Sequence, residues 1–233
     1  MMQAIYQSKG LTKRYGRKTA LDNLSFEVLP GRLVGLLGPN GSGKTTLLKL
    51  SAGLLRPSAG QVFIGGREPG VATKTITSYL PDRMALPVEM RVDDVVNLFA
   101  DFYADFDMVK ASRMLADLKL DPRQRIGTMS KGTQEKMELC LTMSRAAKLY
   151  LLDEPLGGVD PAAREYILNT ILRNYNEDAA VIISTHLVED VERMLDEVLI
   201  LKEGQLLTHR AVDELRQESG MSLDQYFRTV FHV

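Results

Sequence analysis

A chain of 233 residues with 45% hydrophobic and 25% charged residues has the composition of an ordinary globular protein. Its length suits one large α/β domain or one domain with an inserted subdomain. Its net charge of −1 argues against wholesale nucleic-acid binding, which usually shows a clear basic excess. The single cysteine, Cys140, excludes an internal disulfide and a cysteine-based metal cage, which favours a cytosolic protein.

Neither a secretory signal nor a membrane span is predicted. The first residues lack a basic stretch followed by an apolar run. The longest apolar runs, such as residues 149–152, have the length of strands and fall well short of the roughly 18 residues of a membrane helix. We therefore expect no direct span, although the protein could lie against a membrane through a partner.

Residues 1–30 alternate loosely between apolar and polar side chains and are interrupted by Gly10, Gly16 and the Pro30-Gly31 turn. This pattern predicts short antiparallel strands. Five basic residues in this stretch indicate either a solvated face or proximity to a nucleoside triphosphate: Lys9, Lys13, Arg14, Arg17 and Lys18.

An apolar strand at residues 33–37 leads into a glycine-rich loop and then into a helical segment. This context turns the pattern G-x-x-x-x-G-K-T into a phosphate-binding P-loop. Glycines let backbone N–H groups converge on phosphate oxygens, and the helix start adds its positive dipole end. We expect Lys44 to reach the β- and γ-phosphates and the Thr45 hydroxyl to hold Mg²⁺. The expected nucleotide-binding residues are Gly38, Pro39, Asn40, Gly41, Ser42, Gly43, Lys44, Thr45 and Thr46.

The remaining elements alternate between strands and helices. Residues 61–64 and 76–80 predict strands, and apolar side chains at helical spacing over residues 92–120 predict an inserted helical subdomain. Another helix begins near residue 130. Two short, fully apolar runs, at residues 149–152 and 181–184, are typical of a parallel sheet, with a helix after Pro161 between them. A helix over residues 189–195 and a terminal hairpin over residues 198–207 complete the predicted order.

Polar residues follow the two apolar strands where each ends. Asp153 and Glu154 come directly after residues 149–152, and His186 follows the next strand. A carboxylate at Asp153 can hold Mg²⁺ opposite Thr45, and Glu154 can polarise or deprotonate an attacking water. If the two strands are neighbours, His186 lies on the same carboxyl edge of the sheet and can contact the γ-phosphate.

These and further motifs resemble the ATP-binding cassette ATPases of ABC transporters over nearly the whole chain. Tyr15 resembles the aromatic residue that stacks on adenine, and residues 130–134 resemble the LSGGQ signature. Residues 158–160 resemble the D-loop and residues 183–186 the His switch. The resemblance implies an α/β fold: a P-loop NTPase (RecA-like) core with an N-terminal antiparallel β subdomain and an inserted helical subdomain.

The resemblance also implies an assembly. Residues 1–84 and 146–233 would form the nucleotide-binding core, and residues from about 85 to 145 the helical subdomain with the signature segment. Two cassettes, either two copies or a paired different cassette, would pair head-to-tail with ATP and Mg²⁺ between the P-loop of one and the signature segment of the other. Further nucleotide-binding residues would be Ser130, Gly132, Gln134 and Asp160, and the catalytic residues Glu154, His186 and Lys44.

Two positions depart from the family's pattern. The family usually has glutamine after the strand at residues 76–80, whereas this chain has Asp82, which could still coordinate Mg²⁺ beside Thr45 and Asp153. Asp82 also raises the negative charge around ATP, and Arg83 offers a compensating charge. Lys131 replaces a signature glycine, and we expect its side chain to point to solvent, with attraction to phosphate as the alternative.

The leading hypothesis is an ATP-hydrolysing subunit that drives transport through a separate membrane permease, with the cassette on the cytoplasmic, inner face of the cell membrane. Residues 222–227 resemble the end of exporter-type cassettes, which often carry an acidic residue at the Asp82 position, and this favours export. Two alternatives stay open: a soluble cassette that clamps nucleic acid or ribosomes, and a weakly active nucleotide sensor. The near-neutral charge argues against a nucleic-acid partner.

Overall fold

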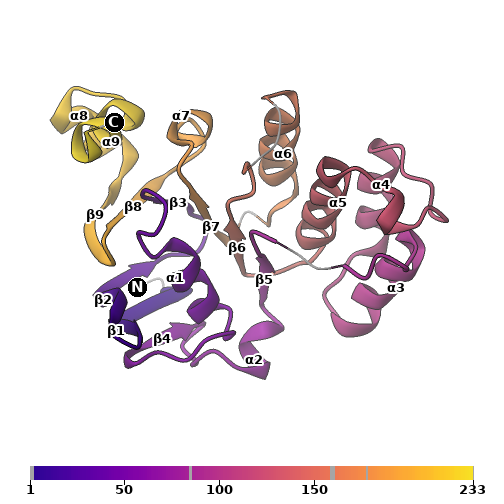
Figure 1. Cartoon of the computed structure of the whole chain (residues 1–233), viewed down its shortest axis with the longest axis horizontal. Helices are drawn as coiled ribbons and strands as arrows, with labels where there is room; N and C mark the ends of the chain where they lie inside the picture. The colour runs from indigo at the N-terminus through magenta and orange to yellow at the C-terminus, as the bar shows by residue number, and fades with distance from the viewer. Residues whose placement is uncertain (1–2, 84–85, 158–160, 177, 233) are drawn as a thin grey trace.

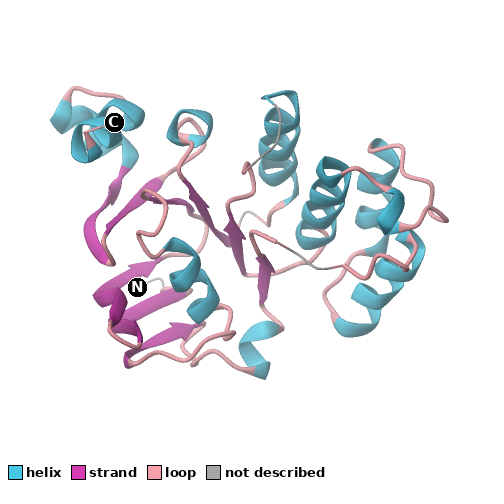
Figure 2. Cartoon of the chain, viewed as in Figure 1, coloured by secondary structure: helices cyan, strands magenta, loops and turns pink. Residues whose placement is uncertain are grey.

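The computed structural model describes residues 3–83, 86–157, 161–176 and 178–232. Its strands are β1 (Tyr6–Tyr15), β2 (Lys18–Val28), β3 (Leu33–Leu37), β4 (Ala59–Ile64), β5 (Thr77–Leu80), β6 (Leu149–Asp153), β7 (Ala180–Thr185), β8 (Glu197–Lys202) and β9 (Gln205–Ala211). Its helices are α1 (Lys44–Ser51), α2 (Val71–Lys74), α3 (Val92–Phe102), α4 (Met108–Asp117), α5 (Lys131–Met143), α6 (Pro161–Asn174), α7 (Val188–Val191), α8 (Val212–Ser219) and α9 (Leu223–Phe231). Figures 1 and 2 show that helices flank the strands.

A six-stranded sheet in the order β5-β6-β7-β3-β8-β9 forms the centre of the molecule. Its first five strands run parallel, and only β9 is antiparallel to its neighbour β8. All residues of β3, β6 and β7 are buried, because helices or strands cover both faces of the sheet. Parallel pairing brings the carboxyl ends of β5, β6, β7 and β3 to one edge, where Leu37 lies opposite Thr185 and Asp153 opposite Ser184.

A second, three-stranded antiparallel sheet has the order β2-β1-β4, which confirms the antiparallel strands expected at the N-terminus. Its inner face packs on α1 and on one face of the central sheet, in a cluster that includes Leu11, Leu47 and Leu36. Successive residues of β3 alternate between the faces, so Leu36 joins this cluster and Leu37 joins the opposite one. The P-loop helix α1 therefore lies between the two sheets.

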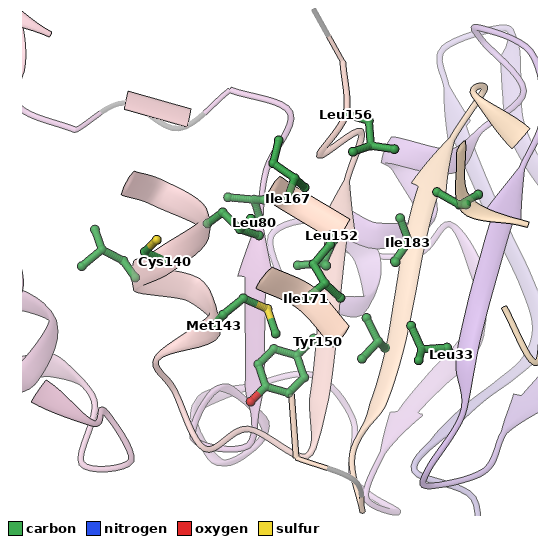
Figure 3. Close-up of a cluster of buried hydrophobic side chains, with 14 of the residues drawn as sticks. Leu33, Leu80, Cys140, Met143, Tyr150, Leu152, Leu156, Ile167, Ile171 and Ile183 are labelled. Atoms are coloured by element: carbon green, nitrogen blue, oxygen red, sulfur yellow. The ribbon is translucent and has the colours of Figure 1, made fainter. Parts of the chain in front are cut away.

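The other face of the central sheet carries the larger helices. Tyr150 and Leu152 of β6 and Ile183 of β7 point into a cluster that also contains Met143 of α5 and Ile171 of α6 (Figure 3). Cys140 is buried in the same cluster, which confirms its interpretation as a small apolar core residue. The signature helix α5 thus shares a core with the strand that ends in Asp153.

The inserted helices α3, α4 and α5 lie together at one end of the molecule (Figure 1). The buried Arg145, just after α5, joins this group to the sheet. Its guanidinium donates to the Asp105 carboxylate at 3.0 Å and to the carbonyls of Thr77 and Lys74 at 2.6 and 3.0 Å. Charged and carbonyl acceptors surround the guanidinium, so that its burial is compensated.

Two expectations about the last third of the chain were wrong. The helix expected over residues 189–195 is the single turn α7, because Asp196 must return to donate its N–H to the Leu33 carbonyl before β8 begins. The chain also continues beyond the β8–β9 hairpin into α8 and α9, which bury Leu215, Leu223 and Phe227. Helix α8 is short and mostly polar, so its sequence gives only a weak helical signal. Helix α9 carries Leu223, Phe227 and Phe231 at helical spacing, a signal that the prediction overlooked.

Candidate functional site

A cavity of about 470 Å³ opens where the P-loop, the β1–β2 hairpin and the carboxyl edge of the central sheet meet. Ten of the residues expected from the sequence line it: Tyr15, Asn40, Gly41, Gly43, Lys44, Thr45, Thr46, Asp82, Glu154 and His186. Lys18, Ala20 and Gly157 also line it. Strands β3, β5, β6 and β7 end at this cavity, so the fold brings together residues that are far apart in sequence.

The P-loop conformation requires glycine at its two ends. Gly38 and Gly43 have φ angles of 157° and 111°, in a region that side chains disfavour. A Cβ on Gly38 would lie 2.4 Å from the Leu201 carbonyl oxygen, and one on Gly43 would lie 2.6 Å from that of Ala20. Helix α1 begins at Lys44, directly after the loop, so its free N–H groups face the same space.

Lys44 is a buried cation held over the loop. Its Nζ donates to the carbonyl oxygens of Gly38 at 2.7 Å and Pro39 at 3.3 Å, and lies 3.2 Å from Glu154 Oε1. These contacts place a positive charge where phosphates would meet the N-terminus of α1.

Asp153, the last residue of β6, is buried beside Thr45 and Ser184. Its Oδ1 accepts hydrogen bonds from the Ser184 hydroxyl at 2.7 Å and from the Thr45 hydroxyl at 3.1 Å. Its Oδ2 has no hydrogen-bond partner among the described residues. Burial raises the pKa of this carboxyl, the two hydroxyls lower it, and the charges of Asp82 and Glu154 raise it again.

These groups fit a magnesium ion. A buried carboxylate oxygen without a partner is costly unless a cation or donor meets it. Carboxylate and hydroxyl oxygens are the hard ligands that Mg²⁺ prefers, usually together with phosphate oxygens. The free Oδ2 of Asp153 and the neighbouring Thr45 hydroxyl supply this chemistry.

Glu154 lies between two cationic or potentially cationic groups. One carboxylate oxygen is 3.2 Å from Lys44 Nζ, and the other is 3.0 Å from His186 Nδ1. Its φ angle of 49° is unusual for a residue with a side chain. Hydrogen bonds from its N–H to the Ser184 carbonyl and hydroxyl, at 3.1 and 3.0 Å, hold this conformation.

Sequence comparison decides which P-loop protein this is. The profile of the ABC transporter family matches residues 21–157, more than half of the chain. The chain belongs to the ABC transporter family. It is therefore an ATP-binding cassette, which binds ATP with Mg²⁺ and hydrolyses it.

Several relatives support this assignment. An uncharacterised ABC transporter ATP-binding protein of Methanocaldococcus jannaschii is 32% identical over 219 residues, covering 92% of this chain and 80% of the relative. A daunorubicin resistance ATP-binding protein of Streptomyces coeruleorubidus is 29% identical and covers 91% and 69%. A solved ATP-binding subunit of an ABC transporter superposes with a TM-score of 0.85 at 26% identity, covering 97% of this chain and 99% of the other.

The signature segment of this cassette lies outside the cavity. Ser130 begins α5, where its hydroxyl accepts from the Thr133 N–H at 3.2 Å, and Gln134 donates its side-chain amide to the Ile126 carbonyl at 3.0 Å. In the part of the chain that the structure describes, Ser130, Gly132 and Gln134 are absent from the cavity lining. Lys131 is exposed and pairs with Glu135 at 3.3 Å, as its predicted solvent orientation requires.

Tyr15 and Asp82 both line the cassette's cavity. The Tyr15 ring is 46% exposed, with Lys13 Nζ 5.2 Å from its centroid, so its face is accessible to a base. Asp82 is about half exposed, and Arg83 Nε lies 3.9 Å from its carboxylate, consistent with a compensating charge. Asp160, with the D-loop at residues 158–160, lies outside the described residues.

Sequence reasoning missed one central residue. Ser184 is fully buried, and its single hydroxyl donates to Asp153 and accepts from the Glu154 N–H. The sequence offers one signal for this role: Ser184 is a small polar residue inside an apolar strand, two positions before His186. Its role depends on the pairing of β6 with β7, which no local pattern states.

No helix among the described residues combines the length and apolar character that crossing a bilayer requires.

Proposed function

We propose that this cassette hydrolyses ATP to power export through a separate membrane subunit. The observation that carries the proposal is the joined arrangement of Lys44, Glu154 and His186 beside Asp153 and Thr45. The arrangement supports the proposal because Lys44, Glu154 and Thr45, which we propose as phosphate-binding cation, base and magnesium ligand, line the same cavity. The presence of all three argues against a catalytically weak nucleotide sensor.

Each side chain then has a role in hydrolysis. Backbone N–H groups of the P-loop and Lys44 bind the phosphates, and Tyr15 stacks on adenine. Thr45, Asp153 and Asp82 would hold Mg²⁺, which would supply positive charge that neutralises the phosphates. Glu154 would accept a proton from the attacking water, and His186 holds the Glu154 carboxylate and would contact the γ-phosphate.

We infer that a second cassette completes the site. Ser130, Gly132 and Gln134 carry the family's signature but lie outside this chain's own cavity. In a head-to-tail dimer, the N-terminus of α5 from one subunit would face the phosphates bound to the other. ATP then joins the two subunits, and hydrolysis releases them.

The partner subunit would be a permease that contacts the inserted helices, for which we propose boundaries at about residues 85 and 145. Phe102 at the end of α3 is 75% exposed and Val109 on α4 is 81% exposed, so both can contact a partner. This association would hold the cassette on the inner face of the cell membrane. A Bacillus subtilis relative that is named as a peptide export ATP-binding protein, 27% identical to this chain, supports an export role.

Isolation of the tagged protein from membranes in gentle detergent tests this partnership. We expect an integral membrane protein to copurify, and we expect the Phe102→Asp/Val109→Asp variant to lose it while its ATP binding is retained. Val71→Asp is the matched control, because Val71 is 86% exposed on α2, outside the inserted helices. Recovery of nucleic acid without a membrane protein would contradict the proposal and favour a soluble clamp.

Ser184→Ala tests the metal site without touching a proposed ligand. The variant removes one hydrogen bond to Asp153 and one from the Glu154 N–H. We expect the Mg²⁺ concentration for half-maximal ATP hydrolysis to rise about tenfold, the effect of roughly one buried hydrogen bond. A magnesium titration of steady-state ATPase activity measures this shift.

Ser144→Ala is the control for Ser184→Ala. Ser144 is equally buried, and its hydroxyl donates to the Cys140 carbonyl at 2.6 Å, away from the cavity. The control loses a buried hydroxyl but should keep the magnesium dependence of the unaltered protein. A Ser184→Ala titration curve that overlies that of Ser144→Ala would show that Ser184 does not orient Asp153.

A further inference from the structure

The turn between β8 and β9 lies against the P-loop and against β2, two segments that carry residues lining the ATP cavity. Gly204 in this turn donates its N–H to the Ser42 carbonyl of the P-loop at 3.0 Å. Its own carbonyl accepts from the Asp22 N–H of β2 at 2.8 Å. In Figure 1 the closed end of the β8–β9 hairpin reaches β2. One residue is therefore bonded to the phosphate-binding loop and to the strand that carries Ala20.

The turn lies so close to β2 that residue 204 has no room for a side chain. Gly204 has a φ angle of 81°, and a Cβ there would lie 2.8 Å from the Ala20 carbonyl oxygen and 3.2 Å from Leu21 Cα. The preceding Glu203 also has a positive φ angle, 49°. Two successive residues in this uncommon region give a tight turn that fits between β2 and the P-loop.

The side chain after the turn adds a further contact to the same strand. Gln205 Nε2 donates to the Asp22 carboxylate at 3.2 Å, on the surface of the molecule. The end of β8 touches the P-loop as well, because a Cβ on Gly38 would meet the Leu201 carbonyl oxygen. The end of the hairpin therefore contacts the P-loop at Gly38 and Ser42, and it contacts strand β2 at Ala20 and Asp22.

The two sides of the cavity belong to different sheets. Tyr15, Lys18 and Ala20 come from the antiparallel sheet, whereas the P-loop follows β3 of the central sheet. ATP must contact both sides at once, with its base near Tyr15 and its phosphates near Lys44. Its affinity therefore depends on the distance between the two sides, as for any ligand with two linked contacts.

We propose that the Glu203-Gly204 turn is a strap that fixes the base side of the cavity, Tyr15 to Ala20, relative to the P-loop, and that Gly204 is a positioning residue for ATP. This inference rests on ATP binding in the cavity as proposed above. The strap contributes to the affinity of ligands that reach both sides. A ligand that occupies only the P-loop gains nothing from it.

Gly204→Ala tests the strap, with ATP and inorganic tripolyphosphate as the two probes. Isothermal titration in the presence of Mg²⁺ measures both dissociation constants. We expect the dissociation constant of ATP to rise about tenfold, because the added Cβ displaces the turn from Ala20. The dissociation constant of tripolyphosphate, which needs the P-loop alone, should change less than about twofold.

Gly220→Ala is the matched control. Gly220 has a φ angle of 67°, so alanine there meets a similar backbone strain, but no atom lies within 4 Å of its Cβ position and the residue follows α8. This variant should bind ATP as the unaltered protein does. If Gly204→Ala does not fold, Gln205→Ala replaces it. We then expect the dissociation constant of ATP to rise about twofold and that of tripolyphosphate to stay unchanged.

Three results would overturn the strap. The first is unchanged ATP affinity in folded Gly204→Ala, and the second is an equal loss of affinity for tripolyphosphate in that variant. The third is an equal loss of ATP affinity in Gly220→Ala. With Gln205→Ala as the variant, unchanged ATP affinity would overturn it equally. Failure of the unaltered protein to bind ATP would instead contradict the proposed function, so the two failures are distinguishable.

Discussion

Replacing Glu154 by glutamine is expected to lower the kcat of ATP hydrolysis by about 10²- to 10⁴-fold, the contribution typical of a positioned proton acceptor. Glutamine has the same shape but cannot accept a proton from water. Lys44 and His186 hold the carboxylate in place, at 3.2 and 3.0 Å. The substitution should therefore slow the chemical step and leave ATP binding largely unchanged. The KM for ATP should change little. Steady-state ATPase kinetics measures both values.

The same variant should accumulate as an ATP-bound dimer. ATP can still bring the two subunits together, but the slow hydrolysis no longer separates them. Size-exclusion chromatography with light scattering detects this dimer. Adding Ser130→Arg should abolish the dimer. Position 130 is the N-cap of α5, and the larger side chain there would fill the space that the phosphates bound to the partner subunit need. Glu214→Gln, on the exposed surface of α8, is the control and should behave as the unaltered protein. Undiminished turnover in Glu154→Gln would remove Glu154 from the mechanism.

Lys44→Ala is expected to weaken Mg²⁺–ATP binding by at least about 30-fold. Removing one partner of a buried, hydrogen-bonded charge pair costs about 2–5 kcal/mol, and here the lost partner is the phosphates' main cation. Lys44 is 5% exposed, so water cannot replace its charge effectively. The variant also leaves Glu154 with His186 as its remaining described ion-pair or hydrogen-bond partner among side chains. Titration with a fluorescent ATP analogue measures the affinity.

Lys49→Ala serves as the control, because Lys49 lies on the same helix α1 and is absent from the described lining of the ATP cavity. Its removal should leave ATP affinity within about twofold of the starting value. A thermal melt without nucleotide shows whether Lys44→Ala remains folded. If folded Lys44→Ala binds ATP as tightly as Lys49→Ala does, the phosphates do not lie at the P-loop.

Local patterns predicted most of the elements and most of the cavity lining. The apolar runs at β3, β6 and β7 identified buried parallel strands, and the glycine pattern before Lys44 identified the P-loop. Parallel strands end at one edge of a sheet. Residues placed just after such strands, Asp153 and His186, were therefore expected at one site, and the structure brings both there.

Other features could not be read from local patterns. Helix α8 has too few apolar residues for a clear period, and the packing of α8 on β9 and of α9 on α7 stabilises this end of the chain. The hydrogen bond from the side-chain amide of Gln134 to the carbonyl of Ile126, for example, joins two segments, and no local pattern states it. These outcomes depend on packing between segments and on the direction of single side chains.

The sequence by itself determined the fold class, the family and the chemistry of the P-loop, because these depend on residue type, spacing and period within short segments. Only the tertiary structure decided that Ser184 orients Asp153 and that Gly204 lies against Ser42 and Asp22. The physical reason is the same in each case. A hydrogen bond such as that between Thr45 and Asp153, 108 residues apart, forms only after strand order and register are set, and these follow from the packing of the whole core.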